Sequence, residues 1–205
     1  MSALAHFPAA AGQRVGLLGG SFNPAHRGHL EISLVALKLL ALDRVVWMVS
    51  PQNPLKTKDA LGSYAARVAR AQATIAGNPR LFVSQFEAEM NLRYSIDTVM
   101  LLTRQRPNTR FVFLMGADNL VALPRWKKWV TLFETIPIAV FARPGWDLAA
   151  PASKAAQRFR SARLPVGAAR RLAAARPPAW VYVPFTHDET SATAIRQAGE
   201  WPQKT

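Results

Sequence analysis

The sequence predicts an α/β fold, a Rossmann-like doubly wound parallel sheet that forms a single domain. Short apolar segments alternate with longer segments of helical periodicity along the chain, as strands and helices do in such folds. Strands that alternate with helices favour a parallel sheet covered on both faces, and right-handed crossovers then favour the doubly wound order. The chain has 205 residues, half of them hydrophobic, which suits one domain with a sizeable core. We therefore expect one domain over residues 1–205.

Six apolar segments are predicted as strands. The first, at 14–18, precedes a glycine pair, and the second is the run Val45-Val46-Trp47-Met48-Val49. We expect the first five strands to lie in the order 3-2-1-4-5, so that the order reverses between strands one and four. The six predicted strands span 14–18, 45–49, 81–83, 110–115, 138–141 and 180–183.

Five segments are predicted as helices. Ser63 is a suitable N-cap for the second, and Gly77-Asn78-Pro79 ends it. Pro107 follows the end of the third helix, and Pro124 begins a new turn within the fourth. A proline-rich loop is expected at 50–59. The predicted helices span 28–40, 63–76, 95–104, 119–134 and 191–198.

Two segments lack a clear pattern of helix or strand. Residues 148–178 are rich in Arg, Ala and Pro, and we expect one or two short helices there and no separate domain. Residues 1–13 are expected to be a flexible N-terminus; they contain no Lys or Arg and no long apolar stretch, unlike a signal peptide. No run of about twenty apolar residues suggests a membrane span, and the chain has no cysteine. We expect a soluble, cytoplasmic protein without a membrane partner.

The chain is strongly basic, with a formal net charge of +14. No Asp or Glu lies between Asp147 and Asp188, a stretch that holds six arginines and Lys154. This charge predicts a solvated basic surface beside a site for anionic substrates. A nucleic-acid-binding face is the alternative, but no recognised nucleic-acid-binding module accompanies the charge, so no nucleic-acid partner is expected.

A glycine-rich motif follows the first predicted strand. It reads Gly-Gly-Ser-Phe-Asn-Pro-Ala-His-Arg-Gly-His over residues 19–29 and leads into the first predicted helix. A strand, a glycine turn and a helix start form a phosphate-binding corner, because backbone N–H groups and the helix dipole favour an anion there. His26 and His29 are spaced to lie on one face of the first turn, where both can donate to one phosphoryl group. Gly28 leaves room for a base or sugar beside the backbone.

This motif resembles the signature of the nucleotidylyltransferase superfamily, and within it most closely that of the nicotinate-mononucleotide adenylyltransferases. The resemblance covers nearly the whole chain and is weakest over 148–178. It implies that His26 and His29 are catalytic, contacting the phosphates of ATP and stabilising the transition state. The motif residues that it places at ATP are Gly19, Gly20, Ser21, Phe22, His26, Gly28 and His29.

A second segment, Thr190-Ser191-Ala192-Thr193-Ala194-Ile195-Arg196, resembles the family's other signature, ISSTxIR. Hydroxyl groups at a helix start with an arginine one turn later form a further anion site. The resemblance implies that Ser191, Thr193 and the catalytic Arg196 bind the β- and γ-phosphates of ATP. Thr190 and Ala192 depart from the pattern.

Gly116 and Asp118 follow the fourth predicted strand. The resemblance places both at the ATP ribose, whose hydroxyl groups can donate hydrogen bonds to a carboxylate. Asp118 is also a suitable N-cap for the next helix.

The resemblance assigns the mononucleotide to a second set of residues. Trp126 is expected to stack on the pyridine ring, whereas Trp129 is expected in the core. Tyr94 and Ser95 resemble the family's Tyr-Thr pair, although Ser95 is equally suited to cap a helix. Lys56 lies in a loop where Leu55 replaces a common histidine. The predicted mononucleotide-binding residues are Asn23, Lys56, Tyr94, Ser95 and Trp126.

The implied reaction is transfer of the adenylyl group of ATP to nicotinate mononucleotide, with Mg²⁺ bound together with ATP, in NAD biosynthesis. A related nucleotidylyltransferase acting on another phosphate ester, such as pantetheine phosphate, is an alternative. An NAD-dependent dehydrogenase is disfavoured because the first turn lacks Gly-x-Gly-x-x-Gly. Only His6 and His187 remain as further histidines, too few for a zinc site without cysteine. A homo-oligomer is compatible with the sequence.

Overall fold

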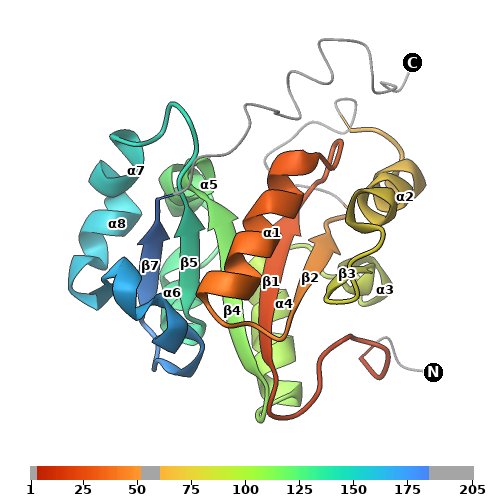
Figure 1. Ribbon diagram of the computed structural model, residues 1–205, viewed down its shortest axis with the longest axis horizontal. Coiled ribbons are helices and arrows are strands. Elements are labelled where there is room, and N and C mark those ends of the chain that lie inside the picture. Colours follow the sequence, from red (N-terminus) through yellow and green to blue (C-terminus); the bar gives the residue numbers. More distant parts are fainter. Residues whose placement is uncertain (1–3, 52–60, 185–205) are drawn as a thin grey trace.

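The strands of the protein form one parallel sheet in the computed structural model, which describes residues 4–51 and 61–184 (Figure 1). The sheet has seven strands within these residues, in the order β3-β2-β1-β4-β5-β7-β6. The predicted order of the first five strands is confirmed, and the predicted sixth strand is β7. The strands span Arg14–Gly20 (β1), Arg44–Val49 (β2), Leu81–Ser84 (β3), Arg110–Gly116 (β4), Ile138–Phe141 (β5), Arg163–Leu164 (β6) and Trp180–Val183 (β7).

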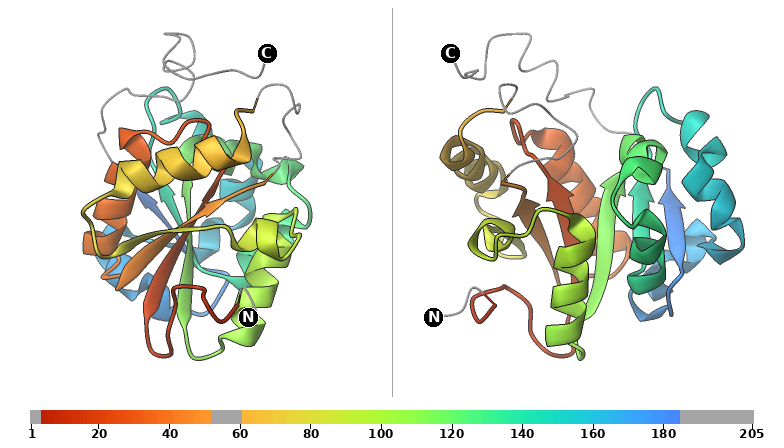
Figure 2. Two further views of the ribbon diagram at one scale, coloured as in Figure 1. Left: turned by 90° about the vertical axis from the view of Figure 1, so that its right-hand side faces the viewer. Right: turned by 180° about the vertical axis from the view of Figure 1, so that it is seen from behind.

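The helices lie on both faces of the sheet (Figure 2). The first three long helices match the predictions to within a residue or two at each end. The predicted helix over 119–134 is wrong as one helix: Pro124 lies in a 3₁₀ turn, and Lys128 has a left-handed backbone with φ 49°. The α-helices span Arg27–Leu39 (α1), Tyr64–Ile75 (α2), Phe86–Glu89 (α3), Ser95–Gln105 (α4), Ala117–Ala122 (α5), Trp129–Thr135 (α6), Ala149–Ala152 (α7) and Lys154–Arg158 (α8), and the 3₁₀ helices span Leu123–Arg125 (η2), Arg160–Ala162 (η3) and Val166–Ala174 (η4). The predicted helix 191–198 lies outside the described residues.

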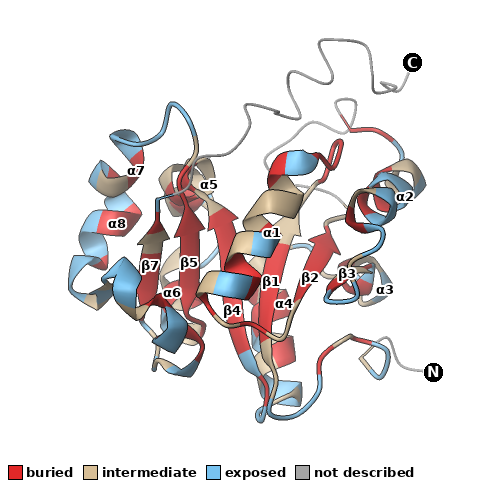
Figure 3. Ribbon diagram, in the orientation of Figure 1, coloured by how far each residue is buried: buried red, intermediate tan, exposed pale blue. Residues whose placement is uncertain are grey.

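Two hydrophobic cores separate the layers, and the strands are buried between them (Figure 3). Successive side chains of β4 alternate between the cores, as a period of two requires: Phe113 belongs to one, and Val112 and Leu114 belong to the other. The first core contains residues of α4, α5 and α6, and the second contains residues of α1, α2 and η4. The sheet is therefore buried on both sides, as parallel sheets are.

The N-terminal segment is packed over residues 4–13, in contrast to the flexible N-terminus that we expected. Phe7 is buried, with its ring centroid 5.2 Å from that of Phe86. The guanidinium of Arg106 donates to the carbonyls of Leu4 (2.6 Å) and Ala9 (2.8 Å). An aromatic anchor, the guanidinium of Arg106 and further hydrogen bonds from Arg44 and Thr109 therefore hold a segment whose sequence has no regular period.

Residues 148–178 contain more structure than the predicted one or two short helices. They form α7, α8, the 3₁₀ helices η3 and η4, and the edge strand β6. The rings of Phe159 and Phe133 stack with their centroids 4.3 Å apart. The main-chain carbonyl of Phe159 accepts a hydrogen bond from Trp180 Nε1 (2.8 Å). Every Lys and Arg of the segment is exposed, which agrees with the predicted basic surface. No helix within the described residues is long and apolar enough to cross a membrane.

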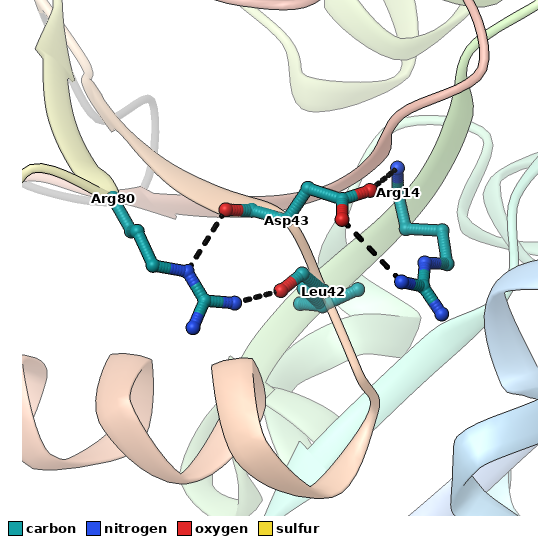
Figure 4. A network of polar contacts seen from close by, with 4 residues as sticks. All are labelled: Arg14, Leu42, Asp43 and Arg80. Atoms are coloured by element: carbon teal, nitrogen blue, oxygen red, sulfur yellow. Dashed lines mark hydrogen bonds and ion pairs between the residues drawn. The ribbon is translucent and has the colours of Figure 1, made fainter.

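Arginines join the strands at their amino ends, far from the predicted site (Figure 4). Asp43 accepts hydrogen bonds from the backbone N–H (2.7 Å) and the guanidinium (3.3 Å) of Arg14. Arg80 donates to the carbonyls of Asp43 (3.0 Å) and Leu42. Burial alone would raise the pKa of Asp43, but the hydrogen bonds and charges of these two arginines lower it overall. These contacts join β1, β2 and β3 at their amino ends. The predicted site lies at the other end of the strands, where they have their carboxyl ends.

Candidate active site

A cavity of about 460 Å³ lies at the carboxyl ends of β1 and β4, where the strand order reverses. This is the position at which ligands bind in doubly wound sheets. It brings together most of the predicted site residues, from segments far apart in the sequence. The predicted residues that line it are Gly19, Gly20, Ser21, Phe22, Asn23, His26, Gly28, His29, Tyr94, Ser95, Gly116, Asp118 and Trp126. Lys56, Ser191, Thr193 and Arg196 lie outside the described residues.

The two histidines stand together at the start of α1. Their ring centroids are 3.9 Å apart, and His26 is the residue that precedes the helix. The backbone N–H of His26 donates to Nδ1 of His29 at 3.3 Å. A neutral imidazole that accepts at Nδ1 carries its proton on Nε2. His29 therefore carries its proton on Nε2, beside the positive end of the α1 dipole.

Aromatic packing fixes the position of His29. Phe22 is buried beneath it, with ring centroids 4.8 Å apart, and stacks on Trp47 at 5.0 Å. Ser33 donates to the carbonyl of His29 (2.8 Å) and accepts from Trp47 Nε1 (2.8 Å). The side chain of Phe22, which we expected at ATP, is thus part of the support of the imidazole.

The glycine pair belongs to the strand and not to a turn, which corrects the prediction. Gly19 and Gly20 are the last residues of β1, and the loop begins at Ser21. A Cβ at Gly20 would lie 3.3 Å from the ring of Phe22. Glycine at this position therefore lets Phe22 fold back under the motif.

Asp118 lines the cavity just after the end of β4. It is not the N-cap of α5, as its sequence position suggested; that position is Gly116. Its Oδ2 forms an ion pair with Arg143 at 2.8 Å, whereas its Oδ1 is buried and has no hydrogen-bond partner among the described residues. A Cβ at Gly116 would lie 2.5 Å from Oδ1. The glycine at position 116 thus leaves room for Oδ1 of Asp118, which can accept a hydrogen bond from a hydroxyl group such as one of a ribose.

The opposite side of the cavity is built by the start of α4 and by the segment after η2. Tyr94 precedes α4 and Ser95 is its first residue, so Ser95 does not cap the helix. Trp126 packs edge-on against Phe113 at 6.4 Å between centroids. Trp129 packs against Phe159 and the core, as predicted. Tyr94 and Trp126 therefore line the same cavity as the histidine pair.

The structure adds charged residues that sequence reasoning missed. Arg93, Arg125, Lys127 and Arg143 all line the cavity. Lys127 lies over the ring of Tyr94, with Nζ 4.2 Å from the centroid, and also pairs with Asp97 at 3.6 Å. Arg93, Arg125 and Lys127 stand directly beside predicted site residues in the sequence, whereas Arg143 has no such neighbour and follows the predicted strand 138–141.

Glu87 is a buried acid in the cavity wall. Its Oε1 accepts a hydrogen bond from Thr98 Oγ1 at 2.9 Å. Burial raises the pKa of Glu87 from 4.5 to about 7, and the hydrogen bond from Thr98 offsets only part of this effect. The folded protein therefore holds a proton on Glu87 at a pH where the unfolded chain has released it.

We expect the variant Glu87→Gln to remove part of the pH dependence of stability. Between pH 4.5 and about 7 the folded state binds more protons than the unfolded state, so a rise in pH destabilises the wild type. Relative to the wild type, the free energy of unfolding of the variant should rise by up to about 3 kcal/mol between pH 5 and pH 8. Urea unfolding at both pH values measures the difference. The exposed Glu89→Gln is the control, and an equal pH response of wild type and Glu87→Gln contradicts the assignment.

Comparisons with known proteins agree with this geometry. A family model described as cytidylyltransferase-like matches residues 17–198. A Parvibaculum lavamentivorans protein named as a probable nicotinate-nucleotide adenylyltransferase is 47% identical over 190 residues, 93% of this chain and 94% of that protein. A Methylorubrum extorquens protein with the same name is 46% identical over 183 residues, 89% of this chain and 98% of that protein. The solved nicotinic acid mononucleotide adenylyltransferase of Plasmodium falciparum, complexed with NaAD, shares the fold: TM-score 0.69 at 14% identity, covering 90% of this chain and 83% of that one.

Proposed function

Since this chain belongs to the nicotinate-nucleotide adenylyltransferases, within the cytidylyltransferase-like family, we propose that it transfers the adenylyl group of ATP to nicotinate mononucleotide. The products are nicotinate adenine dinucleotide and pyrophosphate. The observation that supports this most directly is one cavity with two different walls. One wall carries the histidine pair at the start of α1, and the other carries Tyr94 and Trp126.

The reaction needs positioning and charge neutralisation more than proton transfer. A phosphate oxygen of the mononucleotide attacks the α-phosphorus of ATP, and the bond to pyrophosphate breaks. The attacking phosphate is already ionised, so no general base is required. His29 and His26 donate hydrogen bonds, and the N-terminus of α1, which His26 precedes, adds positive potential where negative charge accumulates. These groups are held in place before the substrates bind.

We assign the ATP ribose to the end of β4. The buried Oδ1 of Asp118 accepts a ribose hydroxyl, and Arg143 holds the carboxylate through its other oxygen. The glycines of the motif let the nucleotide approach the backbone. Ser191, Thr193 and Arg196 complete the proposed ATP site as ligands of the β- and γ-phosphates.

The mononucleotide lies against the other wall, with its pyridine ring on Trp126. The cations Arg93, Arg125 and Lys127 and the N-terminus of α4 surround this end of the cavity. A negative charge on the ring is favoured by all of these groups. We therefore propose a preference for the acid over the amide form of the mononucleotide, with Asn23, Lys56, Tyr94 and Ser95 as further contacts.

We propose that Mg²⁺ arrives bound to ATP. Among residues 4–51 and 61–184, no group of three or more His, Asp or Glu side chains could hold a metal ion. This suits an ion that keeps water ligands and binds through substrate phosphates. When bound, Mg²⁺ neutralises part of the triphosphate charge.

The test is release of pyrophosphate from ATP and Mg²⁺ with different acceptors. We expect kcat/KM for nicotinate mononucleotide to exceed that for nicotinamide mononucleotide by roughly 10-fold or more, since a fully buried carboxylate contact is worth at least that factor. Pantetheine phosphate should give no release above the background without acceptor. Pyrophosphate release with pantetheine phosphate but not with nicotinate mononucleotide would contradict this proposal and support the alternative, a nucleotidylyltransferase acting on another phosphate ester.

A further inference from the structure

Arg67 is a buried cation that the proposed reaction does not use. It lies in the first turn of α2, on the face that also buries Val68 and Ala71 against the sheet, and only 1% of the residue is exposed. Its guanidinium lies over the ring of Tyr64, 5.2 Å from the centroid. No carboxylate of the described residues forms an ion pair with it. An arginine is rarely buried without such a partner, so its contacts need a reason.

Among the described residues, its hydrogen-bond acceptors are four main-chain carbonyls from three separate segments. Nη1 donates to Ser21 (2.7 Å), which follows β1, and to Ser50 (2.8 Å), which follows β2. Nη2 donates to Pro51 (3.0 Å), and Nε donates to Gly62 (3.2 Å), just before α2. One planar group thus joins the two loops at the carboxyl ends of neighbouring strands to the start of a helix.

The same loops form the wall of the cavity. Ser21 and Ser50 both line it. Gly62, whose carbonyl binds Arg67, donates its N–H to Oδ1 of Asn23 at 2.9 Å, which ties the loop after β1 to the same place. The N–H of Ser50 donates to the carbonyl of Gly20 at 2.9 Å. Arg67 lies behind this wall and does not itself line the cavity.

Lysine cannot reproduce this arrangement. The guanidinium is a rigid fork of five N–H donors, four of which point here to fixed carbonyls, whereas an ammonium is a compact group with three. Tyr64 adds to the arrangement from the same helix, since its hydroxyl donates to the carbonyl of Val49 at 3.2 Å. The shape of the loop pair therefore depends on the fork and not on the charge alone.

We propose that Arg67 is a positioning residue, which clamps the loops after β1 and β2 and thereby sets the β1–β2 side of the cavity, where one loop carries Ser21 of the proposed ATP site and Asn23 of the proposed mononucleotide site. The identity of the two substrates rests on the proposed function. The clamp itself is a property of the free protein and can be tested without any substrate.

The first experiment is hydrogen–deuterium exchange of the free full-length protein, with Arg67→Lys compared with the wild type. The control is Arg70→Lys, the same substitution at an exposed position one turn later on α2. We expect Arg67→Lys to speed exchange roughly 10-fold or more at Ser21–Asn23 and Ser50, through local opening, without a change in the β4 segment 110–116. Arg70→Lys should leave all of these segments unchanged.

The second experiment measures the two KM values and kcat. With Arg67→Lys, we expect both KM values to rise roughly 10-fold or more, because the displaced loop carries proposed contacts of both substrates, while kcat at saturating substrates falls less than about 3-fold. Arg67→Gln should behave alike, since it also lacks the fork. A general loss of fold would instead change kcat through the amount of active enzyme and leave both KM values as they were.

Unchanged exchange in the two loops of Arg67→Lys overturns the proposal, and so does an equal rise in the β4 segment. Loss of the fold in both Arg67 variants, or unchanged KM values for both substrates, also overturns it. A wild type without turnover of nicotinate mononucleotide would defeat the proposed function, whereas the exchange data would still decide whether Arg67 clamps the loops.

Discussion

Replacement of His29 by alanine is expected to lower kcat by roughly 100-fold or more, as for the loss of a donor that stabilises charge in the transition state. His29 is held by Phe22, by Ser33 and by the backbone N–H of His26, which donates to Nδ1 and so places the imidazole proton on Nε2. The variant loses the group that we propose to donate to the reacting phosphate. His26→Ala should have an effect of similar size, because His26 stands at the same helix start.

Steady-state rates of pyrophosphate release at saturating ATP and mononucleotide measure this effect. His6→Ala is the matched control, since His6 is exposed in the N-terminal segment and does not line the cavity. Thermal unfolding of all three variants shows whether any loss of rate comes from loss of fold. Near-normal rates in both His26→Ala and His29→Ala would remove the histidine pair from the chemistry.

Replacement of Trp126 by alanine is expected to weaken binding of the mononucleotide by roughly 10-fold or more, as for the loss of one base–aromatic stack. ATP binding should change little, because Asp118 and the histidine pair lie on other parts of the cavity wall. Trp126 is held edge-on by Phe113, so its ring is oriented before the ligand arrives.

Equilibrium binding of each nucleotide, measured separately by calorimetry, distinguishes the two effects. The control is Trp146→Ala, a tryptophan that is 36% exposed and lies outside the cavity wall. It should leave both affinities unchanged. If Trp126→Ala weakened ATP and mononucleotide binding alike, the pyridine ring would have to be placed elsewhere.

Local sequence signals were sufficient for the features that depend on a short stretch of chain. The strands at 138–141 and 180–183 have the predicted ends, and each is a short apolar run with a proline at one end, Pro137 before the first and Pro184 after the second. The histidine motif was recognised from eleven consecutive residues. Its position at the β1–β4 switch followed from topology, since the carboxyl ends of parallel strands meet at one edge.

Features that depend on distant contacts could not be predicted. Arg67 looks like any helical arginine, and only the fold brings Ser21 and Ser50 to its guanidinium. The ion pair of Asp118 and Arg143 joins residues 25 positions apart. Asp118 does not take the N-cap position that its place in the sequence suggested, which belongs to Gly116. Strand β6 has two residues and no apolar run, and its pairing with β7 depends on the path of the chain before it. The burial of Phe7 likewise depends on partners about 80 and 100 residues away.

The two-core architecture has a consequence for how such a protein can change. α1, with the histidines at its start, packs in one layer, and α4 and η2, which flank Tyr94 and Trp126, lie in the other, with the sheet between them. Substitutions around α4 and η2 are therefore expected to alter acceptor binding without disturbing the packing that aligns the imidazoles. A lineage could thus exchange its acceptor while inheriting the histidine pair unchanged.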